Sequence, residues 1–485
     1  MSEETFPVAE SRIAVIDLGS NSLRLVVFER LGDALFPLLN EKVMCALGRG
    51  LSASGRLNPE GVALALANLR RFVALARAIG VEHLAVLATA AVRDAADGRA
   101  FAAEVERQCR VAVTIIDGAE EARLSAAGVL AGIPLAEGLV GDLGGGSIEL
   151  VEVGARTGSS RIGRGLTLPL GPLRLAELGE TPRAIAETVE RALAGVPLLR
   201  GAAGGGLYLV GGAARAIARL HMEHSGYPLH IIHHYTLARA EAEAFFDIVA
   251  RQSRKSLSRI TTIAPKRLEV VPIAALILRR LIAAATPKRV VFSAFGLREG
   301  YAYGHLPHGA DPLIEVCRAL ARRESRFRPD GDRLLQWTAP LFPILGDSAR
   351  RLHRAACWLS DIAWSEHPDY RAEQAFTRSL RMPFAGITHA ERVFIASVLH
   401  TRYGGAAEAP ITLPTRPLMD ERALGTVRTL GLALRLAYTL CGGTSALLSE
   451  VALEREGESV VLAVPASGSL FVGETVQRRL DAVAR

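Results

Sequence analysis

The segments DLGSNSLRLVV (17–27) and DLGGGSIELVE (142–152) align without a gap and carry the same residue at six positions. In each segment an aspartate ends one apolar run, and a polar turn containing glycine leads into a second apolar run, which is the pattern of strand, turn and strand. The two copies start 125 residues apart. A repeat at this spacing predicts two similar lobes, with the two turns facing each other across a cleft.

Around these segments, strand and helix patterns alternate, which predicts an α/β fold. We expect a helix over 59–80, a buried strand over 83–92 leading into a polar loop, a strand over 111–117 and a helix over 120–133. From about residue 311 the apolar positions follow helical spacing until a small terminal hairpin at 447–465. The expected domains are therefore a first lobe at 1–135, a second lobe at 136–305 and a mainly helical region at 311–485.

The composition is that of an ordinary globular protein, with 49% hydrophobic and 22% charged residues in a chain of 485. Its five cysteines are scattered without C-x-x-C pairs, which indicates a reducing compartment. The N-terminal residues are polar and acidic, and the longest apolar stretch, 270–278, is too short to cross a bilayer. We therefore expect a cytoplasmic protein with no membrane association.

The net charge of +7 comes mainly from residues 241–310, where 11 basic residues face 5 acidic ones. This excess fits either a polyanionic partner or a solvated helix face. If the partner is a long polyanion, the candidates to hold it are the basic residues of 251–259 and of the segment after 311. They are Arg251, Arg254, Lys255, Arg259, Arg322, Arg323, Arg326 and Arg328.

The two turns have the composition of phosphate-binding loops, because glycine lets a phosphate approach closely and leaves backbone N–H groups free to bind it. The turn residues are Gly19, Ser20 and Asn21 in one copy and Gly144, Gly145, Gly146 and Ser147 in the other. Asp17 and Asp142, which open the turns, can hold Mg²⁺. One such turn alone is more simply explained as a hairpin former, but the matched pair favours phosphate binding.

Two further candidates stay open from the residues alone. Glu120 and Glu121 begin the expected helix at 120–133, where acidic side chains commonly complement the positive helix end. Arg93 follows a predicted strand and either clamps a phosphate or faces solvent.

Seven motifs in order resemble the exopolyphosphatase / guanosine pentaphosphate phosphohydrolase family, a branch of the actin–hexokinase–Hsp70 superfamily. They are VIDLGSNSLRLVV, LATAAVRDA, DGAEEAR, DLGGGSIEL, LPLGPLRL, LVGGAARAI and GLREG, and they cover roughly residues 12–305. The resemblance implies a duplicated ribonuclease-H-like fold with its active site between the lobes. It also implies Mg²⁺ as cofactor and a homodimer.

The resemblance further implies roles for single residues. Glu121 would orient and deprotonate the attacking water, and Asp142 would bind Mg²⁺ with Asp17 and Glu149 nearby. The terminal phosphate would be held by Ser20, Asn21, Arg93, Gly144, Gly145, Gly146 and Ser147.

The region 311–485 resembles the C-terminal domain of the long form of this family, which is similar to HD phosphohydrolases. HD enzymes need a His-Asp pair for metal, and here Ser360 precedes Asp361. A second metal-dependent site is therefore not expected. Five histidines between 221 and 234 also form no convincing zinc pattern, and we expect them to pack or to form hydrogen bonds. They are His221, His224, His230, His233 and His234.

The resemblance implies an exopolyphosphatase acting on long-chain inorganic polyphosphate, with no specific nucleic-acid partner. The alternative substrate is guanosine pentaphosphate, which the family also hydrolyses. A non-catalytic sensor of polyphosphate or nucleotide is a third hypothesis, against which the retention of Asp17, Glu121 and Asp142 argues. A sugar kinase is not favoured, because the motif at 117–123 resembles the phosphatase branch.

Overall fold

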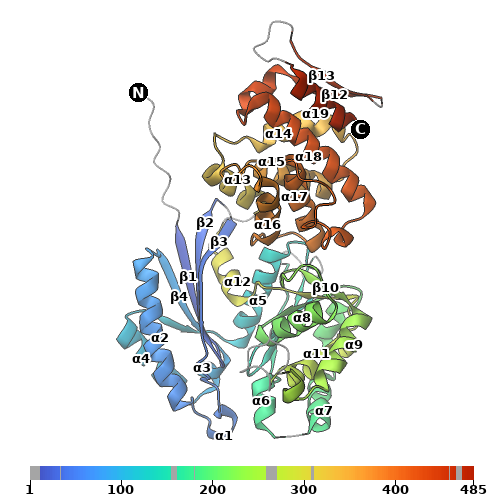
Figure 1. Ribbon diagram of the computed structural model, residues 1–485. Coiled ribbons are helices and arrows are strands. Elements are labelled where there is room, and N and C mark those ends of the chain that lie inside the picture. The colour runs from blue at the N-terminus through green and yellow to red at the C-terminus, as the bar shows by residue number, and fades with distance from the viewer. Residues whose placement is uncertain are drawn as a thin grey trace. The chain divides into compact units, whose positions relative to one another are not determined.

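The computed structural model (Figure 1) describes residues 11–32, 34–154, 161–179, 181–257, 270–306, 311–457, 459–465 and 472–485. The chain divides into two compact units. Unit 1 comprises residues 1–30 and 34–307, and unit 2 comprises residues 31–33 and 308–485. Four residues of the expected boundary segment, 307–310, lie outside the described residues.

The first lobe of unit 1 is built on a five-stranded sheet in the order β3-β2-β1-β4-β5. The strands are β1 (Arg12–Leu18), β2 (Leu23–Leu31), β3 (Ala34–Val43), β4 (His83–Ala88) and β5 (Val113–Ile115). The helices are α1 (Leu51–Ser54), α2 (Pro59–Ala78), α3 (Ala90–Asp94) and α4 (Gly98–Cys109). The helix expected over 59–80 is thus confirmed as α2.

Two strands of this lobe are shorter than the sequence pattern predicted. The strand expected over 83–92 ends at Ala88, and α3 replaces the expected polar loop. Thr89, a residue type favoured before a helix, precedes a run of alanines, which are the strongest helix formers. The strand expected over 111–117 is reduced to β5, at the edge of the sheet.

The second lobe is built on a six-stranded sheet in the order β10-β11-β9-β6-β7-β8. Its strands are β6 (Gly138–Leu143), β7 (Ile148–Val153), β8 (Leu166–Leu168), β9 (Gly206–Val210), β10 (Tyr235–Ala238) and β11 (Arg289–Phe292). Its helices are α6 (Pro172–Glu177), α7 (Pro182–Leu193), η2 (Pro197–Ala202), α8 (Gly212–His224), α9 (Arg239–Ala250), α10 (Arg254–Leu257) and α11 (Val271–Ala285).

The two sheets confirm the duplication that the repeat predicted. The order β8-β7-β6-β9-β11 repeats the order β3-β2-β1-β4-β5. β1 and β6 are each antiparallel to the next strand in the chain and parallel to the strand on their other side. Even the turns agree, because Gly19 N donates to Ser22 O at 3.1 Å and Gly144 N donates to Ser147 O at 3.0 Å.

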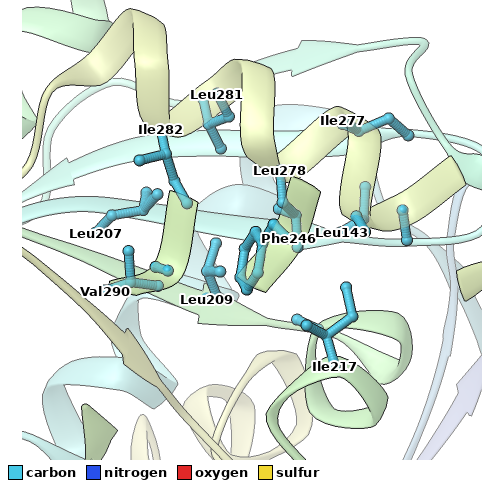
Figure 2. Close-up of a cluster of buried hydrophobic side chains, with 14 of the residues drawn as sticks. Leu143, Leu207, Leu209, Ile217, Phe246, Ile277, Leu278, Leu281, Ile282 and Val290 are labelled. Carbon is cyan, nitrogen blue, oxygen red and sulfur yellow. The ribbon is translucent and has the colours of Figure 1, made fainter. Parts of the chain in front are cut away.

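The core of the second lobe lies between its sheet and the helices α8, α9 and α11 (Figure 2). Buried side chains of α11 pack against those of β9 and β11, each such Leu or Ile contributing about 1.5–3 kcal/mol by leaving water. The figure labels Leu143, Leu207, Leu209, Ile217, Phe246, Ile277, Leu278, Leu281, Ile282 and Val290. The apolar stretch at 270–278 therefore serves this core. Of the helices described, none has the length and apolar character that crossing a bilayer requires.

Two helices, α5 (Gly118–Gly132) and α12 (Leu297–Tyr303), cross each other between the lobes. α5 follows the last strand of the first lobe but packs on β7 and β8, whereas α12 follows the last strand of the second lobe but packs on β1 and β3. Their backbones touch: a Cβ built on Gly300 would lie 1.9 Å from Leu124 O, and one on Gly128 would lie 2.1 Å from Gly296 O. The lobes are thus joined by a crossing that depends on glycine.

Unit 2 is mainly helical, as expected. Its helices are α13 (Pro312–Glu324), α14 (Gly331–Thr338), η4 (Ala339–Leu341), α15 (Asp347–Leu359), α16 (Arg371–Arg381), α17 (His389–Arg402), η5 (Arg416–Leu418), α18 (Glu421–Cys441), η6 (Ser445–Glu450) and α19 (Glu474–Ala484). The terminal hairpin consists of β12 (Ala452–Glu456) and β13 (Ser459–Ala463).

Candidate active site

A cavity of about 170 Å³ lies between the two matching turns of unit 1. Both turns line it, and they approach each other closely, because a Cβ built on Gly145 would lie 3.4 Å from the Cβ of Ser20. The same added atom would lie 2.8 Å from Leu173 of α6. A side chain at position 145 would therefore have to displace the end of Leu173.

The two aspartates lie at equivalent places in the two sheets. Asp17 is the second-last residue of β1, and Asp142 is the second-last residue of β6. Each strand is bonded to neighbours on both sides, so the backbone that carries each carboxylate is fixed by the sheet. Both side chains line the cavity.

Glu121 enters the same cavity from the first turn of α5. Asp117 caps this helix by accepting a hydrogen bond from Glu120 N at 2.8 Å. Glu120 itself is half-buried and pairs with Arg123, whereas only 9% of Glu121 is exposed. Arg93 Nη1 donates to Glu121 Oε2 at 2.8 Å and to the Ile116 carbonyl at 3.2 Å, so the carboxylate is held in one orientation.

Burial dominates the electrostatics of the three carboxyl groups. It raises the pKa of Glu121 to about 7, against the opposing effect of Arg93, and the charges of Asp142 and Asp17 add to the rise. Burial also raises the pKa of Asp17 and of Asp142. A cluster of buried carboxyl groups with raised pKa values is typical of sites that bind cations or transfer protons.

Two side chains that the sequence analysis did not single out hold the aspartates. Arg298 Nη1 of α12 donates to Asp17 Oδ2 at 3.1 Å, and Ser125 Oγ of α5 donates to Asp142 Oδ2 at 2.5 Å. Ser125 lies four residues after Glu121, which places both side chains on the same face of one helix. This spacing could have identified Ser125 as a site residue from the sequence. Arg298 belongs to the GLREG motif, but its partner is 281 residues away in the chain.

The structure brings most of the predicted site residues into the wall of this one cavity. They are Asp17, Ser20, Asn21, Glu121, Asp142, Gly144, Gly145, Gly146 and Ser147. Two lie behind the wall instead. Arg93 contacts Glu121, and Glu149, which is 1% exposed, accepts a hydrogen bond from Ser147 Oγ at 2.6 Å.

The cavity also has basic side chains in its wall. Besides Arg298, they are Arg24, Lys42 and Arg215, none of which the sequence analysis assigned to the site. They lie on different elements of both lobes, so no local pattern joins them. Their positive charge suits an anionic ligand.

The histidines at 221–234 make protein contacts where the structure describes them. His221 Nδ1 lies 2.7 Å from the hydroxyl of Tyr235, and His233 Nε2 lies 3.0 Å from the Gly132 carbonyl. Within the described ranges, no three His, Cys, Asp or Glu side chains come close enough to enclose a metal on their own.

In unit 2, Asp361, which the sequence analysis compared with the metal-binding pair of HD enzymes, takes part in an ion-pair network. Asp361 accepts two hydrogen bonds from Arg326, at 3.1 and 2.9 Å, and one from Arg402 at 3.2 Å. Arg326 is thus engaged by a carboxylate. Of the candidates at 251–259, Arg251 pairs with Asp247 at 2.7 Å, while Arg259 and the side chains of Arg254 and Lys255 lie outside the described residues.

Comparison with known families gives two matches that together cover most of the chain. Residues 25–308 match the model of the Ppx/GppA phosphatase family. Residues 313–485 match the model described as "Exopolyphosphatase, C-terminal".

Among curated proteins, the chain is similar to Exopolyphosphatase 2 of Mycobacterium tuberculosis, with 28% identity over 299 residues, 56% of this chain and 91% of that protein. Among solved structures, it is similar to the Aquifex aeolicus member of the Ppx/GppA family, with a TM-score of 0.53 and 23% identity over 61% of this chain and 97% of that one. An exopolyphosphatase from Cytophaga hutchinsonii gives a TM-score of 0.55 and 22% identity over 62% of this chain and 100% of that one.

Proposed function

Because the chain belongs to the Ppx/GppA phosphatase family, we propose that this phosphatase hydrolyses the terminal phosphoanhydride bond of inorganic polyphosphate and releases orthophosphate. Relatives named exopolyphosphatase and the match of residues 313–485 support this substrate. The observation that carries the chemistry is the placement of Glu121, which is buried, oriented by Arg93 and in one cavity with two carboxylates from the two lobes.

Glu121 acts as the general base. A base is most effective when its pKa lies near the working pH, and burial raises the pKa of Glu121 to about 7. Arg93 binds Oε2, so Oε1 accepts the proton of the attacking water. Hydroxide then attacks the terminal phosphorus, and the shortened chain leaves with its bridging oxygen.

The two turns bind the terminal phosphate from both sides. The amides of Gly19 and Gly144 close the turns. In the part of the chain that the structure describes, the amides of Asn21, Gly145 and Gly146 donate to no protein acceptor. These N–H groups and the hydroxyl of Ser20 suit the phosphoryl oxygens. Glu149 has a supporting role, because it fixes the Ser147 hydroxyl in the cavity wall.

Asp17 and Asp142 have the chemistry of a Mg²⁺ site. Burial raises the pKa of both carboxyl groups, and a cation would offset their buried charge. Mg²⁺ in proteins commonly takes one or two carboxylates and completes its shell with water and substrate phosphate. When bound, the ion would neutralise charge on the phosphoryl group. We propose that Asp142 and Asp17 hold it, with Arg298 and Ser125 keeping the two carboxylates in place.

A phosphate-release assay tests this function. Wild-type protein is given polyphosphate of defined chain lengths or guanosine pentaphosphate, with and without Mg²⁺. We expect a larger kcat/KM on polyphosphate and no release without the ion. A larger kcat/KM on guanosine pentaphosphate would make the nucleotide the substrate. Binding of both compounds without release of phosphate would identify the chain as a sensor.

A further inference from the structure

A second cavity in unit 1, of about 380 Å³, adjoins the candidate active site. Its wall includes Arg93, Ala119 on the first turn of α5, and Thr167 of β8, so both lobes contribute to it. Ser147 lines this cavity and also the cavity between the two turns. Because Arg93 lies behind the wall of the first cavity and lines the second, we call the second one the rear cavity.

Two arginines line the rear cavity and retain N–H groups for a ligand. Arg93 uses Nη1 for Glu121 and for the Ile116 carbonyl, and among the described residues its Nη2 has no hydrogen-bond partner. Arg174 of α6 uses Nη2 for Asp94 Oδ2 at 2.9 Å, and its Nη1 has no such partner in the same part of the chain. An anion in the rear cavity would therefore meet two guanidinium groups, one from each lobe.

Two carboxylates also line the rear cavity, and both are engaged. Asp117 caps α5, and Asp94 lies between the two arginines, 3.4 Å from Arg93 Nε and 2.9 Å from Arg174 Nη2. The side chains of Arg174 and Asp94 are 31% and 36% exposed, and an ion pair that water reaches contributes little to stability. The link that Asp94 makes between α3 and α6 can therefore open easily when another anion takes its place at the arginines.

The proposed reaction leaves its product on the side of the rear cavity. In phosphoryl transfer the attacking and leaving oxygens lie roughly in line, so the water and Glu121 lie opposite the departing chain. Orthophosphate then forms between the turns, with the shortened chain in front of it. It can leave after the chain has dissociated, or on the side of Glu121. The rear cavity opens on that side, because Arg93 both lines it and contacts Glu121.

We infer that the rear cavity is a binding site for the product, through which orthophosphate leaves while the shortened chain is still bound. Arg93 and Arg174 bind the departing orthophosphate, and Asp94 gives up its place between them. The charges of Asp94 and Asp117 keep this binding weak, as an exit requires. The inference rests on the proposed function, because it needs orthophosphate to form beside Glu121.

A comparison of cleaved with released orthophosphate tests this route. Full-length protein with Mg²⁺ is mixed rapidly with long-chain polyphosphate. Acid quenching then counts all cleaved orthophosphate, and a fluorescent phosphate sensor counts only what has left the protein. Ala119→Trp places a large side chain in the rear cavity from an exposed position, and Arg174→Gln removes one of its charges. The matched controls are Ala67→Trp, exposed on α2, and Arg183→Gln, exposed on α7.

In Ala119→Trp and Arg174→Gln we expect the first cleavage at the wild-type rate and steady-state release slowed about tenfold, because orthophosphate must wait for the chain to dissociate. A burst of about one cleaved orthophosphate per active site then precedes release, and the wild-type rate of this burst shows that both variants are folded. The two controls should release orthophosphate as wild type does.

Wild-type release in Ala119→Trp and Arg174→Gln overturns the inference. So does an equal fall in cleavage and in release, because the two residues would then act on the reaction and not on the exit. If the wild-type protein cleaves no orthophosphate from polyphosphate, the proposed function itself fails, and acid quenching alone shows this.

Discussion

Glu120 and Glu121 are adjacent residues with the same side chain, and their surroundings give them different properties. Glu120 faces solvent and pairs with Arg123 on the next turn of α5. Glu121 is buried, touches Arg93 and lines the cavity. Because the helix turns by about 100° between neighbours, one glutamate stabilises the helix start and the other reaches the reacting groups.

Glu121→Gln should lower kcat by about 10²–10⁴, since it removes the base but keeps the size of the side chain and an oxygen for Arg93. The measurement is steady-state phosphate release, together with the equilibrium affinity for polyphosphate, which should change little. Glu120→Gln is the matched control and should retain wild-type kcat. Similar losses in both variants would show that Glu121 has no special role in the reaction.

The pH dependence of activity follows from the same residue. Its carboxylate must be unprotonated to act as base, and burial raises its pKa to about 7. We expect kcat/KM to rise about tenfold per pH unit below this value and to level off above it. A profile measured from pH 5 to 9 checks this, and a rise centred near pH 4.5 would assign the proton transfer to an ordinary, exposed carboxylate.

The pH dependence of stability has the opposite sign. The folded protein holds a proton on Glu121 between pH 4.5 and about 7, where the unfolded chain has released it, so this group makes folding less favourable as the pH rises through that range. Glu121→Gln should therefore be more stable than wild type at pH 8, by up to about 3 kcal/mol, and much less so at pH 5. Urea titrations at both pH values, without divalent metal, measure the difference; the same gain at both would contradict the raised pKa.

At the scale of elements, the crossing of α5 and α12 organises the site. α5 carries Glu121 and Ser125, and α12 carries Arg298, so a single contact between two helices sets the base and the groups that hold both aspartates. The crossing is close because Gly128 and Gly300 have no side chains. Glycine in a helix interior costs stability, and here it allows the two backbones to touch.

Gly300→Ala tests this crossing. The new methyl group would lie 1.9 Å from Leu124 O, so the helices must separate, at a cost of about 1–3 kcal/mol. We expect a lower melting temperature and a fall in kcat that exceeds the change in KM, because the groups that act on the reaction move apart. Gly425→Ala on α18, where an added Cβ meets nothing within 4 Å, is the control and should leave kcat unchanged. Unaltered stability and kcat in Gly300→Ala would show that the crossing is not tight.

The elements also show what the sequence was able to predict. The repeat revealed the paired hairpins, because each is built from neighbouring residues, and most of the predicted site residues lie on these two turns. The resemblance to a known family identified Glu121 as a catalytic candidate. Its position in the sequence alone had left its role undecided. Arg298 and the basic side chains of the wall were missed because their partners are distant in sequence. Dividing the chain by residue number also could not show that α5 packs on the second sheet and α12 on the first.

At the scale of the whole molecule, unit 1 contains every residue proposed for catalysis. The Aquifex aeolicus and Cytophaga hutchinsonii structures are matched over 97–100% of their length by only 61–62% of this chain. Chains of that length therefore form this fold without a counterpart of the remaining residues. Unit 2 contains none of the residues proposed for catalysis.

A protein truncated after residue 310 should keep its kcat/KM on tripolyphosphate within about threefold, since the catalytic cavity lies in unit 1. Hydrolysis of long polyphosphate should slow at least about tenfold and depend less on salt, because phosphate contacts outside the cavity are lost and each contributes to the salt dependence. Rates at two chain lengths and three salt concentrations measure both effects. Retained activity on tripolyphosphate is the control for folding. Equal losses on both substrates in a folded variant would remove unit 2 from long-chain binding.

The two lobes differ at the cavity in the residue that lies opposite each aspartate. In the first sheet Asp17 lies opposite Arg24, and at the equivalent place in the second sheet Asp142 lies opposite Glu149. The two ends of a linear phosphate chain are chemically identical. A cleft with true twofold symmetry would bind such a chain in both directions with equal affinity. Arg24 lines the cavity beside Asp17, whereas Glu149 lies behind the wall beside Asp142, so the two sides of the cleft carry different charges. For the proposed substrate, the two sides of such a cleft are not interchangeable, and the terminal phosphate meets a different charge on each side.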